Sequence, residues 1–226
     1  VQRAIDAGFP ADKIVYAGVG KSDREILTAL QHDIFCFNVE SIPELEVINE
    51  LAAREGKVAR VCLRINPDVE AHTHTHIITG MAENKFGIAL HDMLHVVQLA
   101  QQLPNISFIG LHFHIGSQIT NMHDFVALCE RINEIQHLLH KHAIYPSVIN
   151  VGGGLGIDYQ TPNEHPIADF KAYFRVFTQY LHLRPEQSLH FELGRSVVAQ
   201  CGSLITRVLY VKQTATKQFA IVDAGM

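Results

Sequence analysis

Three short motifs, each at the end of an apolar run, carry the residues best suited to chemistry. They are His112–Ser117, Gly152–Gly156 and Glu192–Arg195, and they begin 40 residues apart, at positions 112, 152 and 192. That interval is about the length of one strand–helix–strand unit. Polar residues that recur at strand ends with this regularity predict one pocket, built from successive strands of a parallel β/α fold.

The glycine-rich motif is suited to binding an anion. Four of its five residues are glycine, which exposes backbone N–H groups and allows positive φ, so a phosphate can be cradled without a side chain. In βα barrels a phosphate site commonly lies in the loops after the late strands. The glycines alone leave a flexible tight turn as the alternative.

Charged residues end two of the apolar runs. Glu192 ends one of them, with Arg195 three residues later, and Arg64 ends another. A buried carboxylate is costly without a partner. Glu192 and Arg195 therefore form either a structural ion pair, or a carboxylate that faces a ligand cation beside an arginine free to bind an anion.

Histidines gather at two places in the chain. His112 and His114 share one face of a strand by alternation, which predicts that one or both point into the pocket, and Ser117 could add a hydroxyl to the anion site. A second set, at positions 72, 74 and 76, could bind a metal ion. Because threonines separate these three and no carboxylate lies in the local run, a role in the loop is favoured and no metal site is predicted.

The composition narrows the class of protein. The chain has 226 residues, a net charge of −5 and 47% hydrophobic residues, as is typical of a soluble globular protein, and the acidic balance argues against nucleic acid as a partner. It has no apolar stretch near the ~18 residues of a membrane span, and no signal peptide is expected. The four cysteines are scattered with no CxxC pair, which is typical of free thiols in a reducing compartment, so we expect a cytoplasmic protein.

Apolar runs and helical patterns alternate along most of the length. The expected strands are 13–19, 34–39, 58–65, 106–114, 147–151 and 189–193, and the expected helices are 22–31, 41–56, 91–102, 122–142 and 167–182. This alternation predicts an α/β fold, a (β/α)8 TIM-type barrel with about six of its eight βα units present. A doubly wound open sheet is the competing architecture.

Two domains are expected. Residues 1–195 form the partial barrel, whose first strands would precede Val1. Residues 196–226 begin a C-terminal β domain, since Val197–Val211 and Lys217–Val222 are β-rich with no helix between them. Both ends of the chain look cut from a longer protein.

Together these motifs resemble the fold-type III pyridoxal-phosphate-dependent decarboxylases, whose barrel is like that of alanine racemase. The resemblance runs nearly end to end. It is carried, in chain order, by Lys13–Asp23, Arg64–Pro67, Thr75–Gly80, Asn84–Ile88, His114–Gln118, Gly152–Gly156 and Val222–Met226.

The resemblance implies a role for each matching residue. His114 would stack on the ring of pyridoxal 5′-phosphate, and Arg64 would help to orient the ring. Glu192 would pair with the pyridine nitrogen and keep it protonated, so that the ring acts as an electron sink. The phosphate would be held by Ser117 and the Gly152, Gly153 and Gly154 loop. Arg195, beside Gly194, would bind the phosphate or a substrate carboxylate.

Two departures from the family pattern stand out. Leu193 occupies a position where the family usually has proline, between the intact Glu192 and Arg195. No lysine of this chain matches the lysine that forms the family's Schiff base, which is expected upstream of Val1. No catalytic residue is therefore predicted within the chain, and further substrate contacts are expected after Met226.

The resemblance implies decarboxylation of an amino acid. It is strongest for the reaction that converts meso-2,6-diaminopimelate to L-lysine and CO2, the last step of lysine biosynthesis. The family's active site forms between two subunits, so a homodimer is implied, and the isolated chain is expected to be inactive. Ornithine, arginine and carboxynorspermidine are the alternative substrates. A non-catalytic pyridoxal-phosphate-binding barrel is a further alternative, against which the β-rich residues after Arg195 argue.

Overall fold

The computed structural model of the chain describes residues 1–69 and 86–224, in two compact units, Val1–Ser196 and Val197–Met226. The three histidines at 72, 74 and 76 lie outside the described residues. So do the motif at 75–80, part of the motif at 84–88, and the last two residues of the chain.

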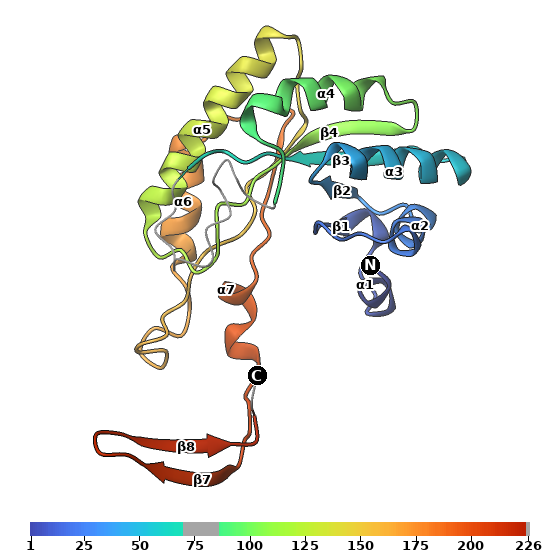
Figure 1. Cartoon of the computed structure of the whole chain (residues 1–226). Coiled ribbons are helices and arrows are strands. Elements are labelled where there is room, and N and C mark those ends of the chain that lie inside the picture. Colours follow the sequence, from blue (N-terminus) through green and yellow to red (C-terminus); the bar gives the residue numbers. More distant parts are fainter. Residues whose placement is uncertain (70–85, 225–226) are drawn as a thin grey trace. The chain divides into compact units, whose positions relative to one another are not determined.

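The first unit is built on one parallel sheet whose strand order follows the chain (Figure 1). Its strands are β1 (Val15–Tyr16), β2 (Cys36–Val39), β3 (Ala59–Arg64), β4 (Ile106–His112), β5 (Val148–Asn150) and β6 (Ser188–His190). A doubly wound sheet reverses its strand order at a switch point, and this sheet does not. The six strands curl into a half-barrel, so the barrel prediction is confirmed.

Helices connect the strands. They are α1 (Gln2–Asp6), α2 (Asp23–Gln31), α3 (Ile42–Arg54), α4 (Met93–Gln102), α5 (Met122–Lys141) and α6 (Phe170–Tyr180), with single turns of 3-10 helix at Ala11–Lys13 and Leu90–Asp92. Their starts follow capping chemistry: Ser22 and Glu25 form a capping box, and Ser41 and Asp169 accept bonds from backbone N–H groups two or three residues inside α3 and α6. The cap at Asp169 explains why α6 starts later than the predicted 167.

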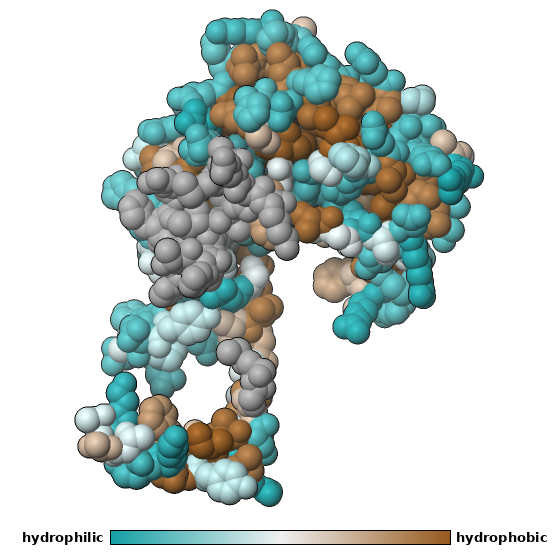
Figure 2. All heavy atoms as spheres, in the orientation of Figure 1, coloured by the Kyte–Doolittle hydropathy of each residue, from teal (hydrophilic) through white to brown (hydrophobic). Residues whose placement is uncertain are grey.

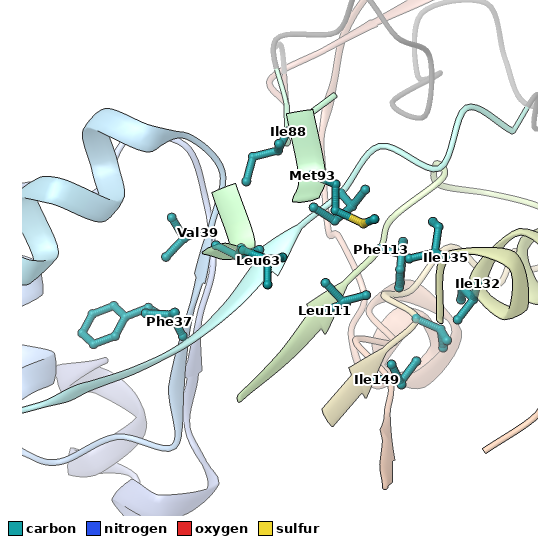
Figure 3. Packing of buried hydrophobic residues seen from close by; sticks show 14 of the residues in the cluster. Phe37, Val39, Leu63, Ile88, Met93, Leu111, Phe113, Ile132, Ile135 and Ile149 are labelled. Atoms are coloured by element: carbon teal, nitrogen blue, oxygen red, sulfur yellow. The ribbon is translucent and has the colours of Figure 1, made fainter. Parts of the chain in front are cut away.

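The consecutive strand order with right-handed crossovers places every crossover helix on the same face of the sheet. On that face, alternate residues such as Phe37, Leu63, Leu111 and Ile149 pack into the core beneath the helices (Figure 3). The residues between them point the other way, into the half-barrel. There Cys36, Cys62 and Val148 make a small second cluster.

The second unit is short. It holds the end of α7 (Arg195–Val198), a 3-10 turn at Ala199–Cys201 and an antiparallel hairpin of β7 (Val208–Gln213) and β8 (Gln218–Val222). The predicted β run from Val197 is therefore wrong at its start, because residues 195–201 are helical. β-branched residues favour a strand only where a neighbouring strand pairs with them, and in the described chain the pairing begins at Val208.

Large apolar side chains lie on the surface of this hairpin, seen as brown atoms at the foot of the view (Figure 2). The most exposed are Tyr210 and Val211, at 70% and 59% of their full area. Among the described residues, no helix is both long enough and apolar enough to cross a membrane.

Candidate functional site

The polar side chains of the three motifs share one face of the sheet, at the carboxyl ends of its strands. Arg64, His112, Asn150 and His190 occupy one level across β3 to β6, since each is in register with the next. The alternation that sends Leu63, Leu111 and Ile149 to the helices sends these residues into the half-barrel. Glu192 lies two residues beyond His190, so the same alternation places it on the same face of the sheet.

The Glu192 carboxylate is held by side chains from three strands. Its Oε1 accepts hydrogen bonds from Asn38 Nδ2 (2.6 Å) and Asn150 Nδ2 (2.8 Å), and its Oε2 lies 3.2 Å from His112 Nε2. Burial raises the pKa of this carboxyl, but the contacts with His112, Asn150 and His114 outweigh burial and lower the pKa to about 2. Glu192 is therefore ionised.

No ion pair joins Glu192 to Arg195 in the described structure. The alternative in which these two residues form a structural ion pair is therefore wrong. The Glu192 side chain keeps 30% of its area exposed. The two amide donors on Oε1 are neutral, so the carboxylate keeps its charge and can receive a cation at Oε2, the oxygen beside His112.

His114 lies beside this carboxylate. Its Nδ1 accepts a hydrogen bond from the Gly153 N–H at 3.3 Å, which ties the end of β4 to the glycine loop. Burial lowers the pKa of the imidazole, and the positive charge of Arg64, together with the neighbouring His112, lowers it further, to about 4. At neutral pH the ring is uncharged, as a stacking surface for a flat ligand requires.

The glycine loop is tightly packed rather than flexible. A Cβ on Gly153 would lie 2.2 Å from the backbone oxygen of Glu192. A Cβ on Gly154, at φ +105°, would lie 2.8 Å from the backbone oxygen of Gly116. The Glu192 N–H also donates to the Gly152 carbonyl at 2.8 Å. The three motifs predicted to share a pocket thus meet at this loop.

Arg195 and Ser117 form the anion-binding part of the site. Arg195 Nη2 donates to Ser117 Oγ at 2.8 Å, and Nη1 donates to Tyr159 Oη at 3.1 Å and Gln118 Oε1 at 3.4 Å. Arg195, Gln118 and Tyr159 also line a cleft of about 610 Å³. A guanidinium and a hydroxyl next to a glycine loop suit a phosphate or a carboxylate. Gly194 has open space where a Cβ would be.

Arg64 is held in a buried ion pair that the sequence analysis missed. Its Nη1 lies 3.1 Å from both carboxylate oxygens of Glu40, and the two side chains are 9% and 2% exposed. The Gly87 N–H donates to the same carboxylate at 3.2 Å, and the guanidinium lies over the Phe86 ring at 5.1 Å. The Nε of Arg64 is buried with no hydrogen-bond partner among the residues described.

Asn38, Asn150 and Glu40 are the site residues that the sequence analysis did not select. All three were visible in the sequence, because each is a polar residue at the end of an apolar strand. That same signal selected Arg64 and Glu192. Within the described ranges, no group of three His, Cys, Asp or Glu side chains could hold a metal ion.

The family model described as "Pyridoxal-dependent decarboxylase, pyridoxal binding domain" matches residues 1–199. The diaminopimelate decarboxylase of Bacteroides thetaiotaomicron is 63% identical over all of this chain, which covers 58% of that protein. For the enzyme of the same name from Neisseria meningitidis serogroup B, identity is 46%, over 99% of this chain and 53% of the relative. The chain thus spans little more than half the length of these relatives.

Solved structures of decarboxylases are also similar to this chain. The diaminopimelate decarboxylase of Helicobacter pylori, complexed with L-lysine, is 38% identical and superposes with a TM-score of 0.86 over 100% of this chain and 56% of that one. The arginine decarboxylase of Paramecium bursaria Chlorella virus has a TM-score of 0.77 over 98% of this chain and 56% of that one. At 19% identity, the second structure shows a shared fold alone.

Proposed function

The chain belongs to the pyridoxal-dependent decarboxylases, through their pyridoxal binding domain, and from this premise we propose that the full-length protein decarboxylates meso-2,6-diaminopimelate to L-lysine and CO2. The names of the relatives support this substrate. One observation carries the chemistry: the ionised Glu192 accepts from two neutral amides, lies against the glycine loop and keeps 30% of its side chain exposed.

The residues present fit pyridoxal 5′-phosphate. We propose that the Gly152, Gly153 and Gly154 loop, with Ser117 and Arg195, holds the phosphate. The loop supports this role because Gly153 and Gly154 lie where a Cβ would clash with backbone. His114 would stack on the ring, Arg64 would border it, and Gly194 would let the backbone approach. When bound, the cofactor supplies an electron sink for the charge left by the departing carboxylate.

The chain's own residues would set the charge of that site. Glu192, with its pKa near 2, remains an anion at any physiological pH and would keep a proton on the ring nitrogen. His114 remains neutral, so it adds no second positive charge beside the ring. Arg195 bonds to Ser117 and Tyr159, which aims its guanidinium at the anion site and leaves it able to reach a substrate carboxylate as well.

We propose that residues 1–195 are the cofactor barrel and that 196–226 begin a β domain. The lysine that carries the cofactor, and the groups that read the far end of the substrate, would lie outside these 226 residues, since the relatives are nearly twice as long. A homodimer with a shared active site is part of the proposal. The exposed apolar hairpin is consistent with cover by further chain or by a second subunit.

A cytoplasmic location is also proposed. The four cysteines form no disulfide, and the sulfur atoms of Cys36 and Cys62 are 3.9 Å apart. Unpaired thiols of this kind are typical of proteins in a reducing compartment.

The test is CO2 release by the full-length protein, with pyridoxal 5′-phosphate, from meso-diaminopimelate, ornithine, arginine and carboxynorspermidine in parallel. We expect release from meso-diaminopimelate with an equal amount of L-lysine. Preference for another substrate would assign a sister decarboxylase. Cofactor binding with no release from any substrate would favour a non-catalytic binding protein. The 226-residue chain alone should release none.

A further inference from the structure

Lys21 is a buried lysine to which the proposed chemistry assigns no role. Only 1% of its side chain is exposed. Its Nζ donates to the backbone oxygens of Gly18 (2.6 Å) and Asn38 (2.7 Å) and to Glu44 Oε1 (2.5 Å). An ammonium group has three protons to donate, so all three are used and the lysine holds one position.

The Lys21–Glu44 pair fixes the backbone on both sides of Val39. Lys21 binds the carbonyl of Asn38, and the other carboxylate oxygen of Glu44, Oε2, accepts from the Glu40 N–H at 2.9 Å. These two contacts fix the peptide groups at the end of β2. That is the point from which the Asn38 side chain enters the site.

Asn38 connects this fixed backbone to the carboxylate. Its side chain is fully buried and its Nδ2 donates to Glu192 Oε1 at 2.6 Å. Its Oδ1 is buried and has no hydrogen-bond partner within the described part of the chain. Burying an unpaired oxygen is unfavourable, so the stabilising contact of this amide is the bond that its N–H group donates to Glu192.

We propose that Lys21 is a positioning residue that sets the place of Glu192 through Asn38. A lysine or arginine bound directly to Glu192 would neutralise the carboxylate permanently, whereas the neighbouring His112 is charged only when it is protonated. A neutral amide orients it and leaves its charge available to a ligand. Lys21, with its own charge matched by Glu44, holds that amide in place from outside the site. This inference rests on the proposed role of Glu192 at the ring nitrogen.

Lys57 provides a matched control. Its Nζ also binds two backbone oxygens, of Leu30 (2.7 Å) and Gln31 (3.2 Å), and one carboxylate, Asp33 Oδ1 (2.9 Å). It lies before the start of β3, at the end of the sheet opposite the site. A purely structural role would make Lys21 and Lys57 alike in their effect on ligands.

The test compares two ligands of the full-length apoprotein: pyridoxal 5′-phosphate and its deaza analogue, in which C–H replaces the ring nitrogen. The ratio of the two dissociation constants isolates the contact between Glu192 and the ring nitrogen. We expect the wild type to prefer the natural cofactor. Lys21→Met and Asn38→Ala should each lower this preference about tenfold while affinity for the analogue stays within about twofold, and Lys57→Met should leave it unchanged.

If Lys21→Met does not fold, the double variant Lys21→Met/Glu44→Met replaces the buried ion pair with apolar groups and should show the same loss of preference. A wild-type preference that survives in these variants would overturn the inference and leave the proposed function standing. Absence of any preference in the wild type would overturn both, because Glu192 would then not contact the ring nitrogen.

Discussion

The guanidinium of Arg195 donates a hydrogen bond of 2.8 Å to the hydroxyl of Ser117, which joins the first residue of α7 to the loop after β4. The two residues are 78 positions apart in the chain. Their contact closes one side of the pocket beside the glycine loop. This contact gives the first prediction.

Ser117→Ala should weaken the binding of pyridoxal 5′-phosphate about tenfold, because a hydroxyl bonded to a charged group is lost. Pyridoxal, which has no phosphate, should bind the variant and the wild type equally. Dissociation constants from absorbance titration measure both. Ser147→Ala, which removes a hydroxyl bonded to the Ile109 carbonyl at 3.0 Å, is the control and should leave both constants unchanged. Equal weakening of both ligands would contradict the phosphate role.

Glu192→Gln should lower the rate of decarboxylation by the full-length protein about a hundredfold or more, since an amide cannot hold the proton on the ring nitrogen. The cofactor should still bind through its phosphate. Steady-state CO2 release measures the effect. Glu186→Gln, which removes an exposed carboxylate paired with Arg184, is the matched control. A Glu192 variant as active as this control would refute the role of the carboxylate.

His114 should make stability depend on pH. Burial, the nearby charge of Arg64 and the neighbouring His112 lower its pKa from 6.5 to about 4. Such a histidine binds a proton more readily in the unfolded chain. Its contribution to the free energy of unfolding is therefore fully present above about pH 6.5 and is lost as the pH falls toward 4. In His114→Phe, the fall in unfolding free energy between these two pH values should be smaller than in the wild type by on the order of 2–3 kcal/mol.

Urea unfolding between these two pH values measures the difference between wild type and His114→Phe. Replacing the exposed His142 with Phe controls for the loss of an imidazole elsewhere. Identical pH dependence in wild type and His114→Phe would contradict the buried, neutral state of this ring.

The buried Arg64–Glu40 pair should matter far more to stability than a surface pair. Glu40→Ala leaves the guanidinium buried without its carboxylate and should cost about 3–5 kcal/mol of unfolding free energy. Glu50→Ala breaks the exposed pair with Arg54 and should cost less than about 1 kcal/mol. Chemical denaturation measures both, and similar costs for the two variants would contradict the burial of Arg64.

Gly153→Ala should abolish cofactor binding, because its Cβ would lie 2.2 Å from the Glu192 carbonyl and the loop would have to move. The overpacking should also cost about 1–3 kcal/mol of stability. Gly202→Ala, with open space at its Cβ, is the control and should bind normally. Normal cofactor affinity in Gly153→Ala would show that the loop does not form the phosphate site.

The sequence was sufficient to predict the sheet and the meeting of the three motifs. Alternation placed His112 and His114 on one face, and the regular spacing placed Gly153 and Glu192 at neighbouring strand ends. Both inferences use short-range periodicity, which a parallel β/α sheet preserves in space.

The partners of the site residues could not be predicted with the same rules. Glu40 and Arg64 meet through the register of the paired strands β2 and β3. Asn38 and Glu192 are 154 residues apart and meet only because the sheet curls. The start of β7 was mistaken for a similar reason. Val197 and Val198 have strand propensity, but propensity forms a strand only where a partner strand is present.

The proposed role of Glu192 is to keep a proton on the ring nitrogen of pyridoxal 5′-phosphate, and the ¹⁵N chemical shift of that nitrogen in the full-length protein reports it. With ¹⁵N-labelled cofactor bound, we expect a protonated nitrogen at neutral pH in the wild type and an unprotonated one in Glu192→Gln. An unprotonated nitrogen in the wild type, or the same protonated shift in both proteins, would contradict it.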